Sequence, residues 1–398
     1  MKSNFLNIHD MVLVLAFFEC LLLAILVRLI SVQRDQSRNI LAVFMIVIGG
    51  WILTTLLIWN EDLQKLAINS TVFSTTLLSI CTLLQGPCLY LYLRSLMEPI
   101  DYRNWRLFIH LLPILPVVFV IFAFDLDGWS WLPWLWPNVS LHEQMAVKFC
   151  WLVTRCTPLI YIVACIYQEI KLRLQYRQVY SSISSLDIKL ADCILIGFFL
   201  HWIWNSIGYF IGGYISVAAN DFMGIVDTYL VVFEVNGLFF LGLLNSRELF
   251  GANPGLVAIP KSRASKDLQI AEDKIQLLEA AISVKRIYLE NNINLSRFAE
   301  LAGLQPREVT MILNQHYKIN FFEFINGLRV DEAKRLLTLP NFDHLSILEI
   351  LHKSGFNSQS AFQRFFKRLE GCSPSEFRKQ AQQKRKQGAG QIMSASNN

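Results

Sequence analysis

Seven long apolar runs dominate the N-terminal part of the chain and limit what it can fold into. They cover residues 11–30, 40–59, 72–93, 107–124, 149–167, 190–211 and 225–244. A helix that crosses a bilayer needs about 20 predominantly apolar residues. The chain as a whole is 54% hydrophobic with a mean hydropathy of +0.39, which is more apolar than an ordinary soluble protein. We therefore expect residues 1–244 to form a seven-helix transmembrane bundle.

The positive charges between the apolar runs predict how these runs are oriented, because Lys and Arg concentrate in the cytoplasmic loops of membrane proteins. Ten lie in the loops around residues 28–38, 94–106 and 168–189: Arg28, Arg34, Arg38, Arg94, Arg103, Arg106, Lys171, Arg173, Arg177 and Lys189. The N-terminus and the remaining connections hold three: Lys2, Lys65 and Lys148. We expect a multi-pass membrane protein with its N-terminus outside and its C-terminus in the cytoplasm.

Charged side chains inside the apolar runs are informative, because placing one in lipid costs about 2.5–3.5 kcal/mol or more. Three of them lie at similar depth below the outer ends of their runs: Glu19, Arg155 and Glu234. One interpretation is a structural ion pair between Arg155 and one of the two carboxylates. The other is an intramembrane ligand-binding or proton-sensing site that also draws on polar residues of the last two runs: His201, Asn205 and Asp227.

The composition changes after residue 244. Residues 1–244 contain 14 Lys and Arg against 16 Asp and Glu, whereas residues 245–398 contain 22 against 15. A basic domain of this kind suits a polyanionic partner such as DNA. Helix-breaking residues predict a linker over residues 245–265: Gly251, Pro254, Gly255 and Pro260.

Two further segments flank the basic domain. Residues 266–291 are predicted to form a linker or signalling helix, because apolar residues recur every seven positions: Leu268, Ile275, Ile282 and Leu289. This helix either packs onto the domain that follows or pairs with a second copy of the chain. Residues 381–398 are polar and begin with a basic cluster at Lys384, Arg385 and Lys386. We expect this tail to be disordered.

A helix-turn-helix pattern lies at residues 347–368. Gly355 separates two short segments with apolar faces, and Ser358 offers a polar start to the second. The apolar positions of the second segment are Phe362, Phe365 and Phe366. The second helix of such a pair can present amide and guanidinium groups to a DNA major groove.

The same pattern occurs earlier, at residues 294–314, as an internal repeat. The four positions Leu295, Phe298, Ala299 and Gly303 precede Ile347, Ile350, Leu351 and Gly355 by 52 residues each. Residues 321–340, which lie between the two motifs, predict one continuous helix about 25 Å long. Such a helix could hold two recognition helices near one DNA turn, about 34 Å, apart.

Residues 266–380 resemble the DNA-binding domain of AraC/XylS-family transcription regulators. The segments that carry the resemblance are FAELAG, FINGLRVDEAKRLL, SILEILHKSGFNSQSAFQRFFKRLEG and SPSEFR. The resemblance implies a DNA-binding domain over residues 292–380, with two helix-turn-helix motifs in adjacent major grooves, in a chain that is a homodimer when active. Residues 1–244 resemble the seven-span portion of integral-membrane members of that family.

The family pattern also implies which residues face DNA. The residues expected at base edges are Arg307, Thr310, Gln359, Ser360, Gln363 and Arg364, and those expected at phosphates are Ser358, Lys367 and Arg368. Two positions depart from the pattern. Leu351 stands where the family usually has alanine, which predicts a wider separation of the second helix pair. Met311 stands where a polar base reader is common, which predicts that the first motif reads bases either weakly or through contact with a thymine methyl group.

These observations predict an all-α chain: a seven-helix transmembrane bundle followed by a soluble helical domain with two helix-turn-helix motifs. Its predicted function is membrane-embedded transcription regulation, in which the bundle senses a small-molecule or physical signal and the basic domain binds double-stranded promoter DNA. The alternative is a membrane transporter or receptor whose C-terminal module is a regulatory or protein-docking domain. No HExxH, Walker loop, CxxC or Ser/His/Asp-like cluster occurs in the sequence, so we expect no enzyme activity, cofactor or metal.

Overall fold

The computed structural model describes residues 7–29, 36–64, 71–126, 140–181, 186–208, 217–244 and 272–395. The chain divides into two compact units. The first consists of Met1–Leu172 and Ser185–Leu256, and the second of Arg173–Ser184 and Val257–Asn398. The second unit therefore includes Arg173–Ser184, a short segment that lies before residue 244, the expected boundary between the two domains. The linker over residues 245–265 lies outside the described residues.

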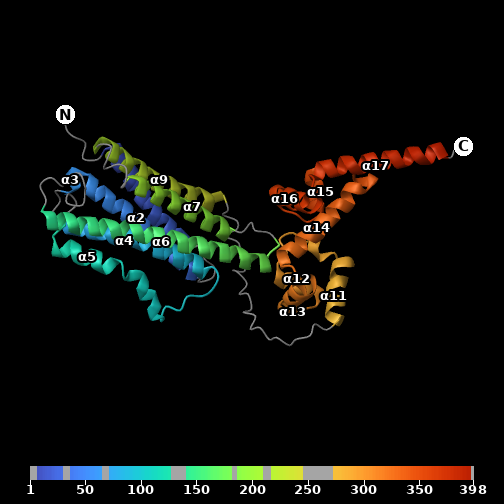
Figure 1. The fold of residues 1–398 in the computed structure, drawn as a ribbon, viewed down its shortest axis with the longest axis horizontal. Coiled ribbons are helices and arrows are strands. Elements are labelled where there is room, and N and C mark those ends of the chain that lie inside the picture. The colour runs from blue at the N-terminus through green and yellow to red at the C-terminus, as the bar shows by residue number, and fades with distance from the viewer. Residues whose placement is uncertain are drawn as a thin grey trace. The chain divides into compact units, whose positions relative to one another are not determined.

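The first unit is built from long apolar helices, coloured blue to yellow-green in Figure 1. They are α1 (Ile8–Leu29), α2 (Gln36–Trp59), α3 (Glu61–Gln64), α4 (Thr71–Ser95), η1 (Trp105–Leu111), α5 (Ile114–Ala123), α6 (Leu141–Val179), α7 (Leu186–Ile207) and α9 (Val217–Leu244). By length and composition, six described helices could cross a membrane, or up to seven if η1 and α5 form one span. The predicted all-α fold is confirmed for the described residues, which contain only one isolated β-bridge.

The fourth apolar run, at residues 107–124, is not one straight helix. Its two parts, η1 and α5, meet at an angle of 44°. Pro113 precedes the first residue of α5, and a proline has no backbone N–H to continue a helical hydrogen-bond ladder. The break follows from that missing donor.

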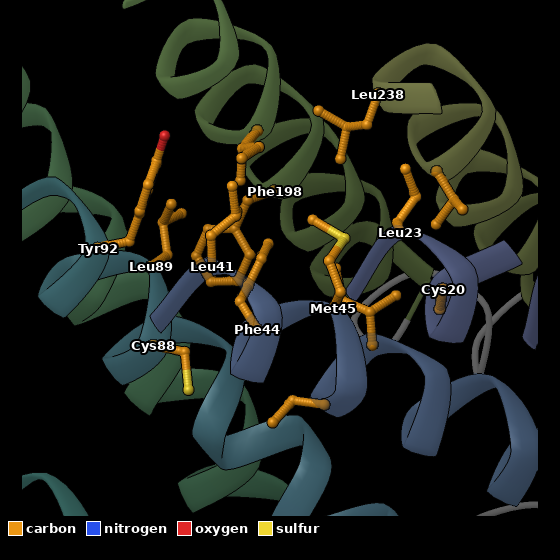
Figure 2. Close-up of a cluster of buried hydrophobic side chains, with 14 of the residues drawn as sticks. Cys20, Leu23, Leu41, Phe44, Met45, Cys88, Leu89, Tyr92, Phe198 and Leu238 are labelled. Atoms are coloured by element: carbon orange, nitrogen blue, oxygen red, sulfur yellow. The ribbon is translucent and has the colours of Figure 1, made fainter. Parts of the chain in front are cut away.

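The core of the first unit joins helices far apart in the sequence. Figure 2 shows part of this core, where side chains of α1, α2, α4, α7 and α9 meet. Small residues let α1 and α2 approach closely, because a Cβ added at Gly49 would lie 3.2 Å from the Cβ of Cys20. Large apolar side chains are also exposed on the outside of this unit, among them Phe18, Phe119, Val163 and Phe233.

The second unit is a set of helices arranged around α14 (Phe321–Thr338), coloured orange in Figure 1. The elements before it are α11 (Glu272–Ser283), η4 (Ile287–Leu289), α12 (Leu295–Ala302), α13 (Pro306–Ile312) and the π-helical turn η5 (Leu313–Tyr317). Those after it are η6 (Pro340–Phe342), α15 (Ile347–Lys353), α16 (Gln359–Glu370) and α17 (Pro374–Ala395).

Two separate hydrophobic cores lie in the second unit, and α14 contributes to both. Phe321, Phe324 and Ile325 join the core of α11, α12 and α13. Phe322 and Val330, with the last turns of α14, join the core of α15 and α16. A single helix therefore carries the two halves of the domain.

Two predictions about the flanks of the domain need correction. The helix predicted over residues 266–291 begins at Glu272 in the described part of the chain and ends at Ser283, because Arg286 adopts a left-handed conformation with φ of 50°. Ile275, Leu278 and Ala281 are buried in the first core, so this helix packs onto the domain. Its predicted residues 266–271 lie outside the described residues.

The tail predicted as disordered over residues 381–398 is helical through Ala395 as part of α17. The helix starts with a reciprocal capping pair, in which Ser373 Oγ accepts from Glu376 N and Glu376 accepts from Ser373 N. Lys, Arg, Gln and Ala then sustain it, because they are favourable helix formers. Arg385 of this segment also forms an ion pair with Asp343, with an N–O distance of 2.8 Å.

Candidate nucleic-acid interface

The first helix-turn-helix motif consists of α12 and α13. Asn294 caps α12 by accepting a hydrogen bond from Arg297 N at 2.8 Å. Gly303 ends α12 with φ of 75°, a left-handed conformation in which glycine has no steric cost. Leu304 N then donates to Ala299 O at 2.8 Å, which closes the turn. The sequence repeat therefore predicted this turn correctly.

The two base-facing candidates of the first motif differ in the structure. Arg307, in the first turn of α13, is exposed. Thr310 is half-buried, and its hydroxyl donates to Pro306 O within the same helix at 2.9 Å. Met311 is also half-buried. Arg307 is thus the more exposed of the two candidates.

The second motif consists of α15 and α16, and its second helix has two distinct faces. Phe362, Phe365 and Phe366 are buried and hold α16 against the core. The opposite face presents the predicted base-facing side chains, all of them exposed: Gln359, Ser360, Gln363 and Arg364. Residues four apart on a helix lie on one face, so the structure places these side chains together on a single exposed surface.

The turn of the second motif depends on Gly355. This residue has φ of +86°, and a Cβ added there would lie 3.0 Å from the backbone of Leu289. Leu351, the departure from the family pattern, is 1% exposed and belongs to the second core. Phe356 N donates to Leu351 O at 3.1 Å. The leucine side chain, which is larger than the family's usual alanine, is therefore buried in the second core.

The three phosphate candidates have different roles in the DNA-free chain. Ser358 caps α16, with its hydroxyl accepting from Ala361 N at 3.4 Å. Lys367 is exposed. Arg368 is already paired with Glu323 of α14, and its guanidinium lies 4.5 Å from the centre of the Phe365 ring. A phosphate would therefore compete with Glu323 for Arg368.

Arg329 is a residue that the sequence reasoning missed. It lies in α14, is 1% exposed, and donates to Tyr288 O at 2.9 Å and to Glu290 O at 3.0 Å. Its guanidinium lies 5.9 Å from the Phe356 ring of the second motif. Burial lowers the pKa of Arg329 to about 10. A charged residue on the apolar side of the predicted helix was the signal that could have revealed it.

The contacts of Arg329 fix one motif relative to the other. It connects the segment before α12 to the turn after α15, by way of the helix that both motifs share. A second link joins the same two loops, since Asn357 donates a side-chain hydrogen bond to Asn292. The spacing of the two motifs is thus set by the buried contacts of Arg329 and an exposed Asn357–Asn292 hydrogen bond, as well as by α14.

A carboxylate in α14 is also held by two arginines. Arg335 donates to both oxygens of Glu332, at 2.9 and 2.8 Å, and Arg286 pairs with the same carboxylate. Burial alone would raise the pKa of Glu332, but the hydrogen bonds from Arg335 and Arg286 outweigh it and lower that pKa. Glu332 is therefore ionised in the folded domain at neutral pH.

The polar residues predicted within the apolar runs fall into separate groups in the first unit. His201 of α7 and Asp227 of α9 approach to 3.0 Å, and Asn205 donates to Asp227 at 2.5 Å. The ring of Trp51 meets His201 edge-on, with 5.3 Å between ring centres. The structure thus brings together the three polar residues of the alternative interpretation.

The three charged residues have the following neighbours among others. Glu19 accepts a hydrogen bond from Asn236 at 3.1 Å. The Arg155 guanidinium lies 4.3 Å from the centre of the Trp151 ring. Glu234 lies against α7 where Gly197 has no side chain, since a Cβ added there would lie 2.3 Å from its carboxyl carbon. Glycine at this position makes room for the carboxylate.

Comparison with known proteins agrees with the geometry of the second unit. Residues 298–380 match a family described as a helix-turn-helix domain, and the relatives of this part of the chain include the arabinose operon regulatory protein of Escherichia coli (strain K12). The C-terminal domain belongs to the AraC family. The AraC-type domain begins inside α12 by this match and extends into α17.

The similarity to these relatives covers about a quarter to a third of this chain. The chain is 30% identical over 138 residues to the HTH-type transcriptional regulator GlxA of Rhizobium meliloti (strain 1021), covering 34% of this chain and 35% of GlxA. It is 29% identical over 115 residues to the putative HTH-type transcriptional regulator YkgA of Escherichia coli (strain K12), covering 28% of this chain and 47% of that protein. For the arabinose operon regulatory protein the identity is 28% over 95 residues, covering 24% of this chain and 32% of the relative.

The chain thus spans less than half the length of each of these relatives. No solved structure matches it.

Proposed function

We propose that this chain is a membrane-embedded transcription regulator that binds promoter DNA through both helix-turn-helix motifs. The observation that carries the proposal is the exposed face of α16, where Gln359, Gln363 and Arg364 project from a helix anchored by three buried phenylalanines. The relatives named as transcriptional regulators support the same function.

The chemistry of this face fits base edges in a major groove. A guanidinium can donate two hydrogen bonds to guanine, and a glutamine amide can both donate to and accept from adenine. We assign base contacts to Gln359, Ser360, Gln363 and Arg364 in the second motif and to Arg307 and Thr310 in the first. Lys367, Arg368 and the α16 N-terminus at Ser358 contact phosphate.

The connecting helix supports simultaneous binding by both motifs. The 18 residues of α14 correspond to a length of about 27 Å. Successive major-groove faces on one side of DNA lie about 34 Å apart. Recognition helices at the two ends of α14 therefore suit adjacent turns of the same promoter. We further propose that the active form is a homodimer on paired sites.

We assign the first unit to the bacterial inner membrane, with the N-terminus outside and the AraC-type domain in the cytoplasm. Its six to seven long apolar helices and its large outward-facing apolar side chains support lipid contact. The excess of Lys and Arg in alternate connections supports the orientation. This topology places the basic domain in the compartment that contains DNA.

The buried group of His201, Asn205 and Asp227 is our candidate for the sensing element of this unit. His201 and Asp227 are 3% and 7% exposed and come from different helices. A small-molecule or physical signal acts through such a group only if it favours one of two arrangements of the helices. A signal that changed the packing of α7 against α9 would change the contacts of this group.

Chromatin immunoprecipitation of the intact chain, followed by sequencing, identifies the promoter sites. Arg364→Ala should then weaken binding of the purified full-length protein by about 5- to 150-fold, equivalent to about 1–3 kcal/mol, and relax the preference at one base pair. The matched control is Arg335→Ala, which should bind DNA normally. Arg335 is an arginine of α14 that pairs with Glu332. An equal loss on every DNA sequence would reassign Arg364 to a phosphate, and an unchanged affinity would contradict the proposal.

A further inference from the structure

The last turn of α6 and the two residues after it are built into the AraC-type domain. Among the described helices, α6 is the one with residues in both units: it starts at Leu141 in the first and ends at Val179 in the second. Val179 is 3% exposed and is part of the hydrophobic core of α11, α12 and α13. Its burial attaches α6 to the half of the domain that holds the first motif.

Backbone and side-chain hydrogen bonds extend this attachment. The Ser181 hydroxyl donates to Ile293 O at 2.7 Å, and Asn326 of α14 donates to Ser181 O at 2.9 Å. Tyr180 forms an antiparallel bridge with Asn294, the residue that caps α12. Ser181 and Asn326 are both 2% exposed, so these bonds are shielded from water. A buried group of this kind costs about 1–3 kcal/mol if its partner is removed.

Most of the attachment involves the half of the domain that holds the first motif, although the Arg177 guanidinium also lies 5.7 Å from the ring of Phe322, which belongs to the second core. Val179 packs with the core of α12 and α13, whereas α15 and α16 have their own core. Ser181 binds the loop that precedes α12, and Asn326 lies in the N-terminal half of α14. A displacement of α6 along or about its axis would thus act first on the cap of α12 and on the position of the first motif.

We infer that residues 176–181 dock permanently on the first helix-turn-helix motif and transmit the state of α6 to it. The docking surface is formed by Ile293, Asn294 and Asn326, and its occupant is this chain's own connection between α6 and α7. This inference rests on the proposed function, because the consequence of docking is measured as DNA binding. It makes α6 a direct connection to the DNA-binding domain, separate from the linker over residues 245–265.

The test uses the full-length chain in lipid nanodiscs and promoter DNA in which each half-site is scrambled in turn. Val179→Asp places a carboxylate in the first core and should abolish docking. We expect it to lose about tenfold or more in affinity for intact DNA, comparable with the loss of one base contact. Binding that depends only on the second motif's half-site should stay unchanged. Val284→Asp is the matched control, because Val284 is 79% exposed in the same unit.

A milder variant keeps the test decisive if Val179→Asp does not fold. Ser181→Ala removes the hydroxyl's hydrogen bond to Ile293 O and leaves only the longer one from Ser181 N, at 3.4 Å. Amide exchange in peptides covering residues 176–181 and 290–298 should therefore accelerate by about fivefold, the factor for about 1 kcal/mol. Ser283→Ala, whose hydroxyl bonds only within α11, should leave these rates unchanged. Wild-type exchange in Ser181→Ala, or equal losses on both half-sites in Val179→Asp, would overturn the inference.

The Arg364→Ala variant in the same assay separates this inference from the proposed function. If Arg364→Ala binds promoter DNA like the wild type, the assignment of DNA binding to α16 fails. If Arg364→Ala loses affinity while Val179→Asp and Ser181→Ala behave like the wild type, the docking of α6 alone is refuted.

Discussion

The buried arginine of α14 provides the sharpest test of how the two motifs are held in register. Replacing Arg329 with methionine keeps much of the side-chain volume but removes both hydrogen-bond donors. Tyr288 O and Glu290 O, now bonded at 2.9 and 3.0 Å, would lose their partner. Each buried carbonyl left without a donor costs about 1–3 kcal/mol, which gives about 2–6 kcal/mol for the pair.

The lower part of that range is the expected result. Burial already disfavours the charged form of Arg329, as its lowered pKa of about 10 indicates, and methionine removes that desolvation cost. We therefore expect a loss of about 2–3 kcal/mol. A loss of 2 kcal/mol corresponds to about 30-fold more frequent local opening.

Hydrogen exchange of the full-length chain measures this opening directly. The peptides to follow cover residues 287–290 and 354–357, because they contain the two carbonyls and the turn against which Arg329 packs. Arg297→Met is the matched control: Arg297 is 46% exposed and pairs with exposed glutamates, so its loss should cost less than about 1 kcal/mol. Wild-type exchange rates in Arg329→Met would refute the idea that this residue couples the motifs.

Two further predictions concern the stability of the same domain. Gly355→Ala should destabilise it by at least about 1–2 kcal/mol, because alanine is strained at φ +86° and its Cβ would lie 3.0 Å from the Leu289 backbone. Gly327→Ala, in the middle of α14 with nothing within 4 Å of the added Cβ, should instead stabilise it by about 0.5–1 kcal/mol, and denaturant unfolding distinguishes the two. The folded-state pKa of Glu332 lies below its ordinary value of 4.5, so its contribution to stability is present above that pH and is lost as the pH falls through the folded pKa. Acid titration of unfolding should show a smaller loss in the Arg335→Met variant, which lacks one of the two arginine partners; an identical acid loss would contradict this account of Glu332.

Local patterns in the sequence were sufficient to predict the helical elements and the duplicated motif. Apolar spacing gives the buried faces of α12, α15 and α16, and Gly303 and Gly355 mark the two turns because each adopts a left-handed conformation. The exposed positions of α16 follow from the same spacing, so Gln359 and Arg364 could be chosen as base-facing without coordinates.

Contacts between distant residues could not be predicted in this way. Ser181 and Asn326 are separated by 145 positions, and nothing in either neighbourhood specifies the other. The tail helix was missed because charge and polarity were taken as evidence for disorder, although the same residues also favour helix.

The central claim, sequence-specific DNA binding by both motifs of the membrane-embedded chain, is tested most directly by the salt dependence of promoter affinity. The full-length protein in nanodiscs should bind its promoter site at least about a thousandfold more tightly than unrelated DNA. Its affinity should fall steeply and log-linearly as salt rises. Equal affinity for promoter and unrelated DNA, or no dependence on salt, would contradict the account.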